Sequence, residues 1–167
     1  MKKRPSWLAR IHKAWSRHTI VWLTGVRRVG KTTLCRDLED TTYFDCELPS
    51  VRREMEDMES FLNAHAGRRI VLDEIHRLGD PAGLLKIAAD HFPRTRILAT
   101  GSSTLGASAK FRDTLAGRKA EVWLTPMTAE DLHAFGDTRL PHRLLHGGLP
   151  PFFLAEEPPE REFQEWL

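Results

Sequence analysis

Five short apolar-rich segments divide the chain, and segments with helical periodicity lie between them. The apolar-rich segments are residues 20–23, 43–46, 70–72, 95–100 and 120–124. Runs of this length predict strands, and fully apolar runs predict strands that are buried on both faces. Because strands that alternate with helices build a parallel sheet covered on both sides, we expect a three-layer α/β fold with a five-stranded parallel sheet.

Helical periodicity is clearest near the amino terminus. Residues 6–17 carry apolar side chains at spacings of three and four: Trp7, Leu8, Ile11 and Trp15. This spacing predicts an amphipathic helix that packs on the sheet. We expect further helices from Lys31 onward, over 55–66, 81–91 and 104–115, and after an N-cap at Thr128.

The composition of the 167 residues is that of a globular protein of ordinary size. No apolar run approaches the roughly 20 residues that a membrane helix needs, so we expect no membrane partner. The basic start is not followed by an apolar signal region, and Cys35 and Cys46 match no metal-ligand spacing or disulfide framework. A cytoplasmic location is the expectation.

Charge is unevenly distributed. Residues 1–36 hold ten Lys or Arg and no acidic residue, whereas the remainder holds fifteen basic and twenty-three acidic residues. A basic arm of this kind could bind DNA. The alternative is that Arg27, Arg28 and Lys31 serve a phosphate-binding loop and the other charges coat a solvated helix. We favour this alternative, since no nucleic-acid motif accompanies the charge.

Residues 19–33 carry the strongest chemical signal. They read T-I-V-W-L-T-G-V-R-R-V-G-K-T-T, which contains the Walker A spacing G-x-x-x-x-G-K-[ST]. Glycines allow the tight turn that directs successive N–H groups at phosphate oxygens, and the following helix adds its amino-terminal dipole. The predicted nucleotide-binding residues are Gly25, Val26, Arg27, Arg28, Val29, Gly30, Lys31, Thr32 and Thr33.

Within this loop, Lys31 is expected to bind the β- and γ-phosphates of ATP, and the Thr32 hydroxyl is expected to be a ligand of Mg²⁺. Thr33 is expected to contribute through its backbone or a supporting contact. A strand–turn–helix that carries Gly and Lys by chance is the alternative. The apolar strand before the motif and the helical segment after it favour the functional interpretation.

The segment R-R-I-V-L-D-E-I-H has the form of Walker B, with Asp73 and Glu74 at the end of an apolar strand. Parallel sheets bind ligands beyond the carboxyl ends of their strands, so Asp73 and Lys31 should converge on one crevice. Asp73 would hold Mg²⁺, directly or through water, and Glu74 would orient the attacking water. Alone, such an acidic pair is equally compatible with a cap of the next helix.

The strand at 95–100 ends in G-S-S-T. Ser102 is our candidate to bind the γ-phosphate or the attacking water, with Ser103 and Thr100 as neighbours; a helix N-cap is an equally good interpretation. The sequence does not match the G-x-S-x-G elbow of a nucleophilic serine. His133, His142 and His146 lack the partners of a metal site and are interpreted as surface residues.

Three segments follow from these patterns: 1–18 as an amino-terminal helix that packs on the core, 19–126 as the nucleotide-binding core, and 127–167 as a helical, proline-rich connector. Its last part predicts a helix with three apolar residues on one face, namely Phe163, Trp166 and Leu167. An apolar face without a partner indicates a piece of a longer protein or a surface that binds one.

The sequence resembles the AAA+-like ATP-binding proteins of bacteria and archaea, which carry an AAA domain followed by a carboxyl-terminal domain of uncharacterised function. The segments that carry the resemblance are T-G-V-R-R-V-G-K-T-T-L, R-R-I-V-L-D-E-I-H, I-L-A-T-G-S-S, T-L-A-G-R and H-G-G-L-P-P-F. The resemblance implies strand order 5-1-4-3-2. It also implies that Arg118 is an arginine finger, which contacts the γ-phosphate bound by a neighbouring subunit, so that copies of the chain would form a homo-oligomer. Finally, it implies that a carboxyl-terminal domain is missing here. A salt bridge, for example with Glu121, is the alternative for Arg118.

The leading hypothesis is therefore an Mg²⁺-dependent ATPase in which hydrolysis is coupled to a conformational change. Adenine is favoured over guanine because the single asparagine, Asn63, is followed by alanine and no N-K-x-D motif exists. A small-molecule kinase is disfavoured, since a water-orienting acid at Glu74 suits hydrolysis. A nucleotide-dependent switch that recruits protein or DNA with little hydrolysis is the second hypothesis.

Overall fold

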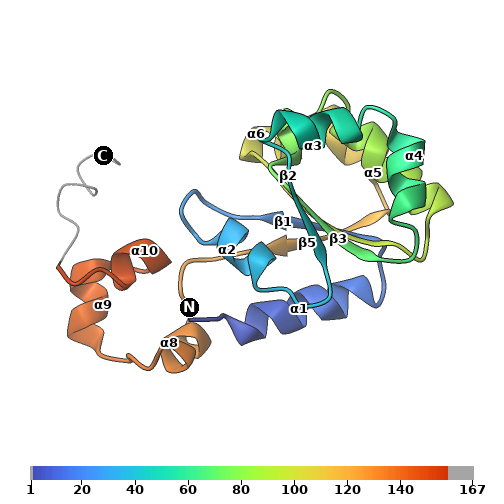
Figure 1. Cartoon of the computed structure of the whole chain (residues 1–167). Coiled ribbons are helices and arrows are strands. Elements are labelled where there is room, and N and C mark those ends of the chain that lie inside the picture. Colours follow the sequence, from blue (N-terminus) through green and yellow to red (C-terminus); the bar gives the residue numbers. More distant parts are fainter. Residues whose placement is uncertain (1, 158–167) are drawn as a thin grey trace.

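A five-stranded parallel sheet forms the centre of the protein in the computed structural model, which describes residues 2–157. Its strands run in the order β2-β3-β4-β1-β5. The bounds are β1 (Ile20–Thr24), β2 (Thr42–Asp45), β3 (Arg69–Asp73), β4 (Arg96–Thr100) and β5 (Lys119–Trp123). Both the expected fold class and the strand order implied by the resemblance are confirmed (Figure 1).

Alternation along the strands divides their side chains between two cores, because successive residues of a strand point to opposite faces. In β1, Ile20 and Trp22 belong to one core and Val21 and Leu23 to the other. All five residues of β1 are buried, since the strand lies inside the sheet between β4 and β5. The fully apolar run in the sequence thus reflects coverage on both faces.

Helices cover the two faces unequally (Figure 1). One face carries α1 (Pro5–Trp15), which contributes Trp7, Ile11 and Trp15 to its core, and α2 (Lys31–Arg36). The other face carries α3 (Pro49–Glu54), α4 (Met58–Ala64), the short 3-10 helix η1 (Ile75–Arg77), α5 (Pro81–His91), α6 (Ser103–Ala107) and α7 (Ala109–Thr114). The resulting three layers agree with the prediction from the sequence.

One helix predicted as continuous is broken, so that prediction was wrong: the segment 104–115 is split at Ser108, whose hydroxyl accepts from Phe111 N at 3.2 Å. The helix predicted over 55–66 is present as α4 but is shorter, because the Asp57 side chain caps its start by accepting from Ser60 N at 3.0 Å. In both cases a short polar side chain replaces a backbone hydrogen bond and starts a new helix.

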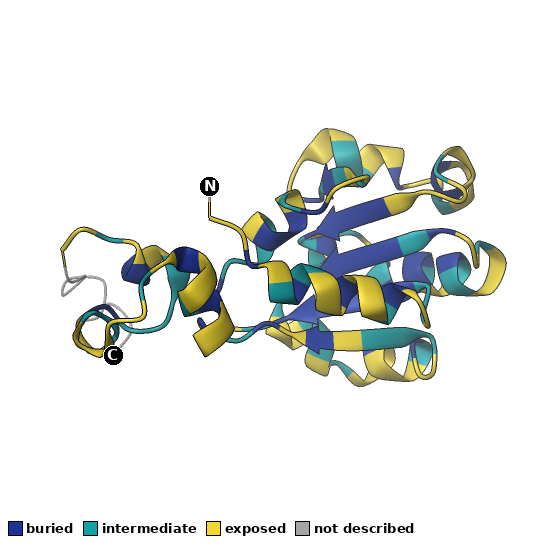
Figure 2. Ribbon diagram, turned by 90° about the horizontal axis from the view of Figure 1, so that it is seen from below, coloured by how far each residue is buried: buried dark blue, intermediate teal, exposed yellow. Residues whose placement is uncertain are grey.

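Three helices extend beyond the sheet, at the left of Figures 1 and 2. They are α8 (Ala129–Phe135), α9 (Leu140–His146) and α10 (Pro150–Phe153). Thr128 caps α8 as predicted, in a capping box with Asp131. A small core of Met127, Phe135 and Phe153 joins these helices. The predicted helix with Phe163, Trp166 and Leu167 lies outside the described residues.

The assignment of His146 to the surface was wrong. Its side chain is buried, stacks on His142 at a centroid distance of 4.0 Å, and places Nδ1 3.1 Å from the Phe152 carbonyl oxygen. The cause is the fold of α10 back onto α9, which a one-dimensional pattern does not reveal. Over residues 2–157, no helix is both long and apolar enough to span a membrane.

Candidate nucleotide-binding site

The loop of residues 25–30 connects β1 to α2, and two glycines give it its shape. Gly25 has φ of 147°, and a Cβ there would lie 2.4 Å from the Leu124 carbonyl oxygen. Gly30 has φ of 96° and forms the N-cap of α2. Side chains other than hydrogen are disfavoured at both conformations, so the Walker A glycines are required by the backbone path itself.

Lys31 lies folded over this loop. Its Nζ donates to the Gly25 carbonyl oxygen at 2.9 Å and to that of Val26 at 3.1 Å. Partial burial lowers the pKa of Lys31, while the carboxylates of Glu74 and Asp73 act in the opposite direction. The ammonium group is therefore held at the loop by weak, neutral acceptors, which the stronger acceptor oxygens of a phosphate can replace.

Asp73, at the end of β3, is buried and its carboxylate is held by two hydroxyl groups. The Tyr43 hydroxyl donates to Oδ2 at 2.7 Å, and the Thr100 hydroxyl donates to Oδ1. Burial and this bond to Asp73 raise the pKa of Tyr43. Each carboxylate oxygen retains acceptor capacity, so the two hydroxyls orient Asp73 without saturating it.

The backbone of Glu74, directly after Asp73, adopts a left-handed conformation, with φ of 55°. Its amide donates to the Thr100 hydroxyl oxygen at 3.1 Å, and its Oε2 lies 3.1 Å from His76 Nδ1. The same Nδ1 lies 3.3 Å from the amide nitrogen of Ser102. The ends of β3 and β4 are thus joined through Thr100 and through His76.

A cavity of about 600 Å³ opens at the carboxyl ends of β1, β3 and β4, and we call it the phosphate-side cavity. Its lining residues are Thr24, Gly25, Val26, Arg27, Lys31, Glu47, Glu74, His76, Arg77, Gly101, Ser102, Ser103 and Trp123. The structure therefore brings Lys31, Glu74 and Ser102 together. The Ser102 hydroxyl also accepts from Leu105 N at 3.2 Å, so this residue caps α6 and lines the cavity at once.

The predicted magnesium ligands do not line that cavity. Asp73 is buried directly before Glu74, and Thr32 lies half-buried in the first turn of α2. Both offer oxygen atoms, which are the donors that Mg²⁺ prefers, and Asp73 is already oriented by Tyr43 and Thr100. These residues fit a cation bound together with nucleotide phosphates, where one or two protein ligands suffice.

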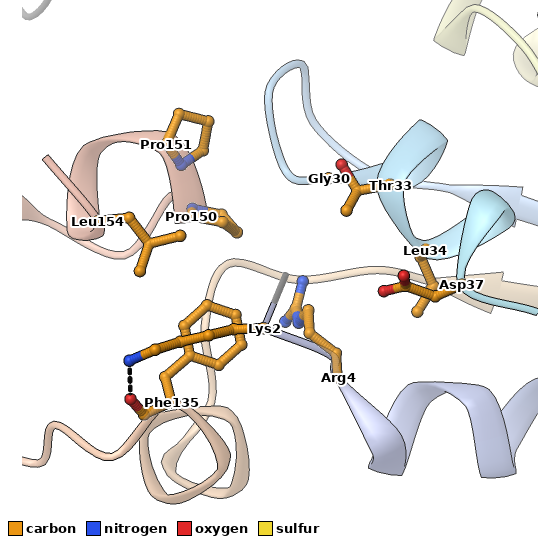
Figure 3. Close-up of a pocket in the computed structure, with 10 residues that line it drawn as sticks. All are labelled: Lys2, Arg4, Gly30, Thr33, Leu34, Asp37, Phe135, Pro150, Pro151 and Leu154. Carbon is orange, nitrogen blue, oxygen red and sulfur yellow. Dashed lines mark hydrogen bonds between the residues drawn. The ribbon is translucent and has the colours of Figure 1, made fainter.

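A second cavity, of about 220 Å³, lies on the other side of Gly30, and we call it the base-side cavity (Figure 3). Its lining is chiefly apolar and comes from the amino-terminal segment, α2, α8 and the region of α10: Lys2, Arg4, Gly30, Thr33, Leu34, Asp37, Phe135, Pro150, Pro151 and Leu154. Of the residues predicted for nucleotide binding, Gly30 and Thr33 belong to it. Its other members come from three separate parts of the chain, at residues 2–4, 34–37 and 135–154, and no single motif in the sequence contains them all.

Comparison with known proteins now adds to this geometry. Residues 17–133 match the protein family described as AAA domain. The chain belongs to that family. Two uncharacterised proteins, Mb2031c of Mycobacterium bovis and Rv2008c of Mycobacterium tuberculosis, are each 34% identical over an alignment of 151 residues, and the match covers 88% of this chain. The chain spans about a third of their length, 33% in each case.

A solved structure, the Walker-type ATPase PABY2304 of Pyrococcus abyssi, is similar to this AAA domain with a TM-score of 0.61. The sequences are 17% identical, and the match covers 92% of this chain and 65% of that one. This structural similarity and the strand order of the sheet both support a P-loop fold. Family and fold together make this an ATPase-type P-loop domain.

A buried arginine in the amino-terminal segment, Arg4, lines the base-side cavity and connects the loop to the helical extension. Arg4 donates to the two oxygens of Asp131 at 3.0 and 2.6 Å, to the Val29 carbonyl oxygen at 3.2 Å, and to that of Thr125 at 3.0 Å. Burial opposes ionisation of Asp131, but hydrogen bonds from Arg4 and Thr128 hold its pKa below the usual range. No motif in the sequence predicts the pair of Arg4 with Asp131.

Arg118 and Lys31 lie at opposite ends of the sheet. Arg118 directly precedes β5, whereas the loop of residues 25–30 follows β1, and β1 and β5 are parallel. It forms a two-bond pair with Asp90, with Nε to Oδ1 at 2.7 Å and the second contact at 3.1 Å. The suggested partner Glu121 was wrong, since Glu121 pairs with Lys119 at 3.1 Å. Arg118 does not belong to the cavities of its own AAA domain.

Proposed function

We propose that this AAA domain binds ATP together with Mg²⁺ and hydrolyses the γ-phosphate bond, and that the cycle changes how the helices α8–α10 sit on the sheet. The observation that carries the proposal is the convergence of Lys31, Glu74 and Ser102 on one cavity, while Gly30 borders a second, apolar cavity. A triphosphate joined to a flat aromatic base, whose faces pack on apolar side chains, matches both sides of the loop.

In this proposal Lys31 exchanges the carbonyl oxygens of Gly25 and Val26 for the β- and γ-phosphates. Thr32 and Asp73 hold Mg²⁺, with Asp73 fixed by its two hydroxyl partners. When bound, Mg²⁺ neutralises charge on the phosphates. Glu74 orients the attacking water, and Ser102 hydrogen-bonds near the γ-phosphate. Arg118 acts only on the nucleotide of a neighbouring subunit, if copies of the chain assemble.

Nucleotide binding is coupled to the position of the helical extension because residues from both the loop and the extension line the base-side cavity. Phe135 and Leu154 come from the helical extension, whereas Gly30 and Thr33 belong to the loop and α2. A base bound between them contacts both parts, so binding or release of the nucleotide changes the contacts between the helical extension and the rest of the protein.

A binding switch with little hydrolysis is the second candidate. It is favoured by the contact between Glu74 and His76, which engages the carboxylate that hydrolysis requires. Its partner would be a protein or DNA. Exposed leucines on α9 offer one apolar surface for a protein, namely Leu140, Leu144 and Leu145.

Calorimetric titration with ATP and with GTP, each with and without Mg²⁺, tests the proposal. We expect ATP to bind more tightly than GTP and Mg²⁺ to strengthen binding. Lys31→Ala should weaken ATP binding about 100-fold, because charged hydrogen bonds to phosphate are worth about 3 kcal/mol. Lys13→Ala, which removes an exposed lysine of α1, is the matched control.

Phosphate release then separates the two candidates. The wild-type protein should release phosphate without any acceptor molecule, and Glu74→Gln should keep ATP affinity while losing turnover. Equal ATP affinity in Lys31→Ala and wild type would mean that the loop is misassigned. Binding without turnover in the wild type would favour the switch.

A further inference from the structure

His76 holds an unusual position between two groups of the phosphate-side cavity. Its Nδ1 lies 3.1 Å from Glu74 Oε2 and 3.3 Å from the amide nitrogen of Ser102. All three residues line the cavity. One nitrogen atom therefore faces both the carboxylate assigned to orient water and the loop that follows β4.

These two contacts place opposite demands on Nδ1. The amide of Ser102 can only donate, so it needs a lone pair on Nδ1. A carboxylate oxygen such as Glu74 Oε2 acts as an acceptor, so this contact needs a hydrogen on Nδ1. A neutral imidazole carries its hydrogen on one ring nitrogen at a time, which means that His76 satisfies Ser102 or Glu74 but not both.

We infer that His76 is a positioning residue, which makes the orientation of the Glu74 side chain depend on whether a γ-phosphate is bound. The inference rests on the proposed ATPase function. Without γ-phosphate, the Ser102 amide donates to Nδ1, and Glu74 has no donor from the ring. A γ-phosphate oxygen is a stronger acceptor and takes the Ser102 amide. The ring hydrogen then moves from Nε2 to Nδ1 by exchange with solvent, and Nδ1–H donates to Glu74 and fixes its orientation.

The surroundings permit this exchange. The His76 side chain is 26% exposed and that of Glu74 is 31% exposed, so water reaches the ring. The backbone on both sides is anchored, because the Thr100 hydroxyl accepts from Glu74 N, and Ser102 caps α6. Only the ring hydrogen and the Glu74 side chain need to change, while the ends of β3 and β4 stay in place.

Nitrogen-15 NMR of labelled histidine gives a direct test, since it distinguishes the two neutral tautomers. We expect the His76 signals to change from the Nε2–H to the Nδ1–H form when a non-hydrolysable ATP analogue with Mg²⁺ replaces ADP with Mg²⁺. The His76→Gln variant identifies the signals among the eight histidines of the chain. An unchanged tautomer in the two complexes overturns the inference.

Turnover provides the second readout. His76→Ala should lower kcat at least 10-fold and leave KM and ATP affinity within about twofold, because a misplaced catalytic group slows chemistry without weakening binding. His76→Asn should retain more turnover than His76→Ala, since its amide both donates and accepts. His91→Gln, at the exposed end of α5, is the control and should behave as wild type.

The failures are distinguishable. If the wild-type protein does not bind ATP in calorimetry, the proposed function falls and this inference falls with it. If ATP binds and Glu74→Gln loses turnover, but His76→Ala turns over as wild type does, only the role of His76 is refuted. A parallel loss of ATP affinity and kcat in His76→Ala would likewise refute positioning.

Discussion

Two cavities of different character flank the same loop. The phosphate-side cavity includes charged and polar residues that follow parallel strands, such as Glu74 and Ser102, whereas the smaller base-side cavity is more apolar and is assembled from distant segments. Residues at strand ends are fixed by the sheet. Residues of the base-side cavity depend on how the amino-terminal segment and the helical extension pack together. Phosphate binding should therefore survive changes that abolish base binding, and the following three variants test that difference.

The largest effect is expected from Asp131→Asn, which leaves the buried guanidinium of Arg4 without its charged partner. Breaking a buried pair costs about 3–5 kcal/mol of the free energy of unfolding. Chemical denaturation measures this loss. The control is Asp90→Asn, which breaks the exposed pair with Arg118 and should cost far less. Similar losses in the two variants would show that burial does not set the strength of these pairs.

The same pair has a defined pH dependence. The pKa of Asp131 is held below the usual carboxyl range in the folded protein, so the folded state keeps this group ionised where the unfolded chain binds a proton. Its contribution is complete above about pH 5 and is lost as the pH falls below about 4. The difference in stability between wild type and Asp131→Asn should therefore shrink in acid. A difference that grows in acid would contradict this sign.

An intermediate effect is expected from Leu154→Glu, which places a carboxylate in the wall of the base-side cavity. ATP affinity should fall about 10-fold, as expected from the loss of one apolar contact surface, while affinity for tripolyphosphate should stay unchanged. Leu144→Glu adds the same charge on α9 outside the cavity and is the matched control. Equal weakening of ATP and tripolyphosphate would show that the two cavities do not act separately.

The smallest effect on binding is expected from Arg118→Ala, because this arginine belongs to neither cavity of its own chain. ATP affinity should equal that of the wild type, and turnover per chain should fall only at concentrations where copies assemble. Turnover measured against protein concentration tests this, with Arg112→Ala as a control on the exposed side of α7. A monomer that loses activity equally would refute a role in trans.

The phosphate-side cavity could be predicted from the sequence because its chemistry is local. Lys31 follows Gly30 directly, and Glu74 follows the β3 strand that carries Asp73, so motif and strand order suffice to bring them together. The contact of Tyr43 with Asp73 was not predictable in the same way. It depends on the register that sets Tyr43 opposite Val71, two residues before Asp73, and register is fixed only when β2 pairs with β3.

The base-side cavity and the pair of Arg4 with Asp131 were missed for a different reason. Arg4 and Asp131 are 127 positions apart, and the cavity residues come from three separate parts of the chain. Periodicity predicted α1 and the N-cap at Thr128 predicted α8, but neither pattern specifies how the two helices pack against each other. The start of α4 and the break between α6 and α7 were closer to prediction, since Asp57 and Ser108 are residue types that favour N-caps.

The two glycines of the loop differ in how they limit sequence variation. At Gly25 the obstacle is volume, because even a methyl group would lie 2.4 Å from the Leu124 carbonyl oxygen. At Gly30 the nearest atom to an added Cβ is Pro150 Cγ at 3.8 Å, so the obstacle is the backbone torsion alone. Asparagine adopts positive φ more readily than other residues with a side chain. A library randomised at both positions would therefore return glycine alone at 25, and would admit asparagine as the first substitute at 30.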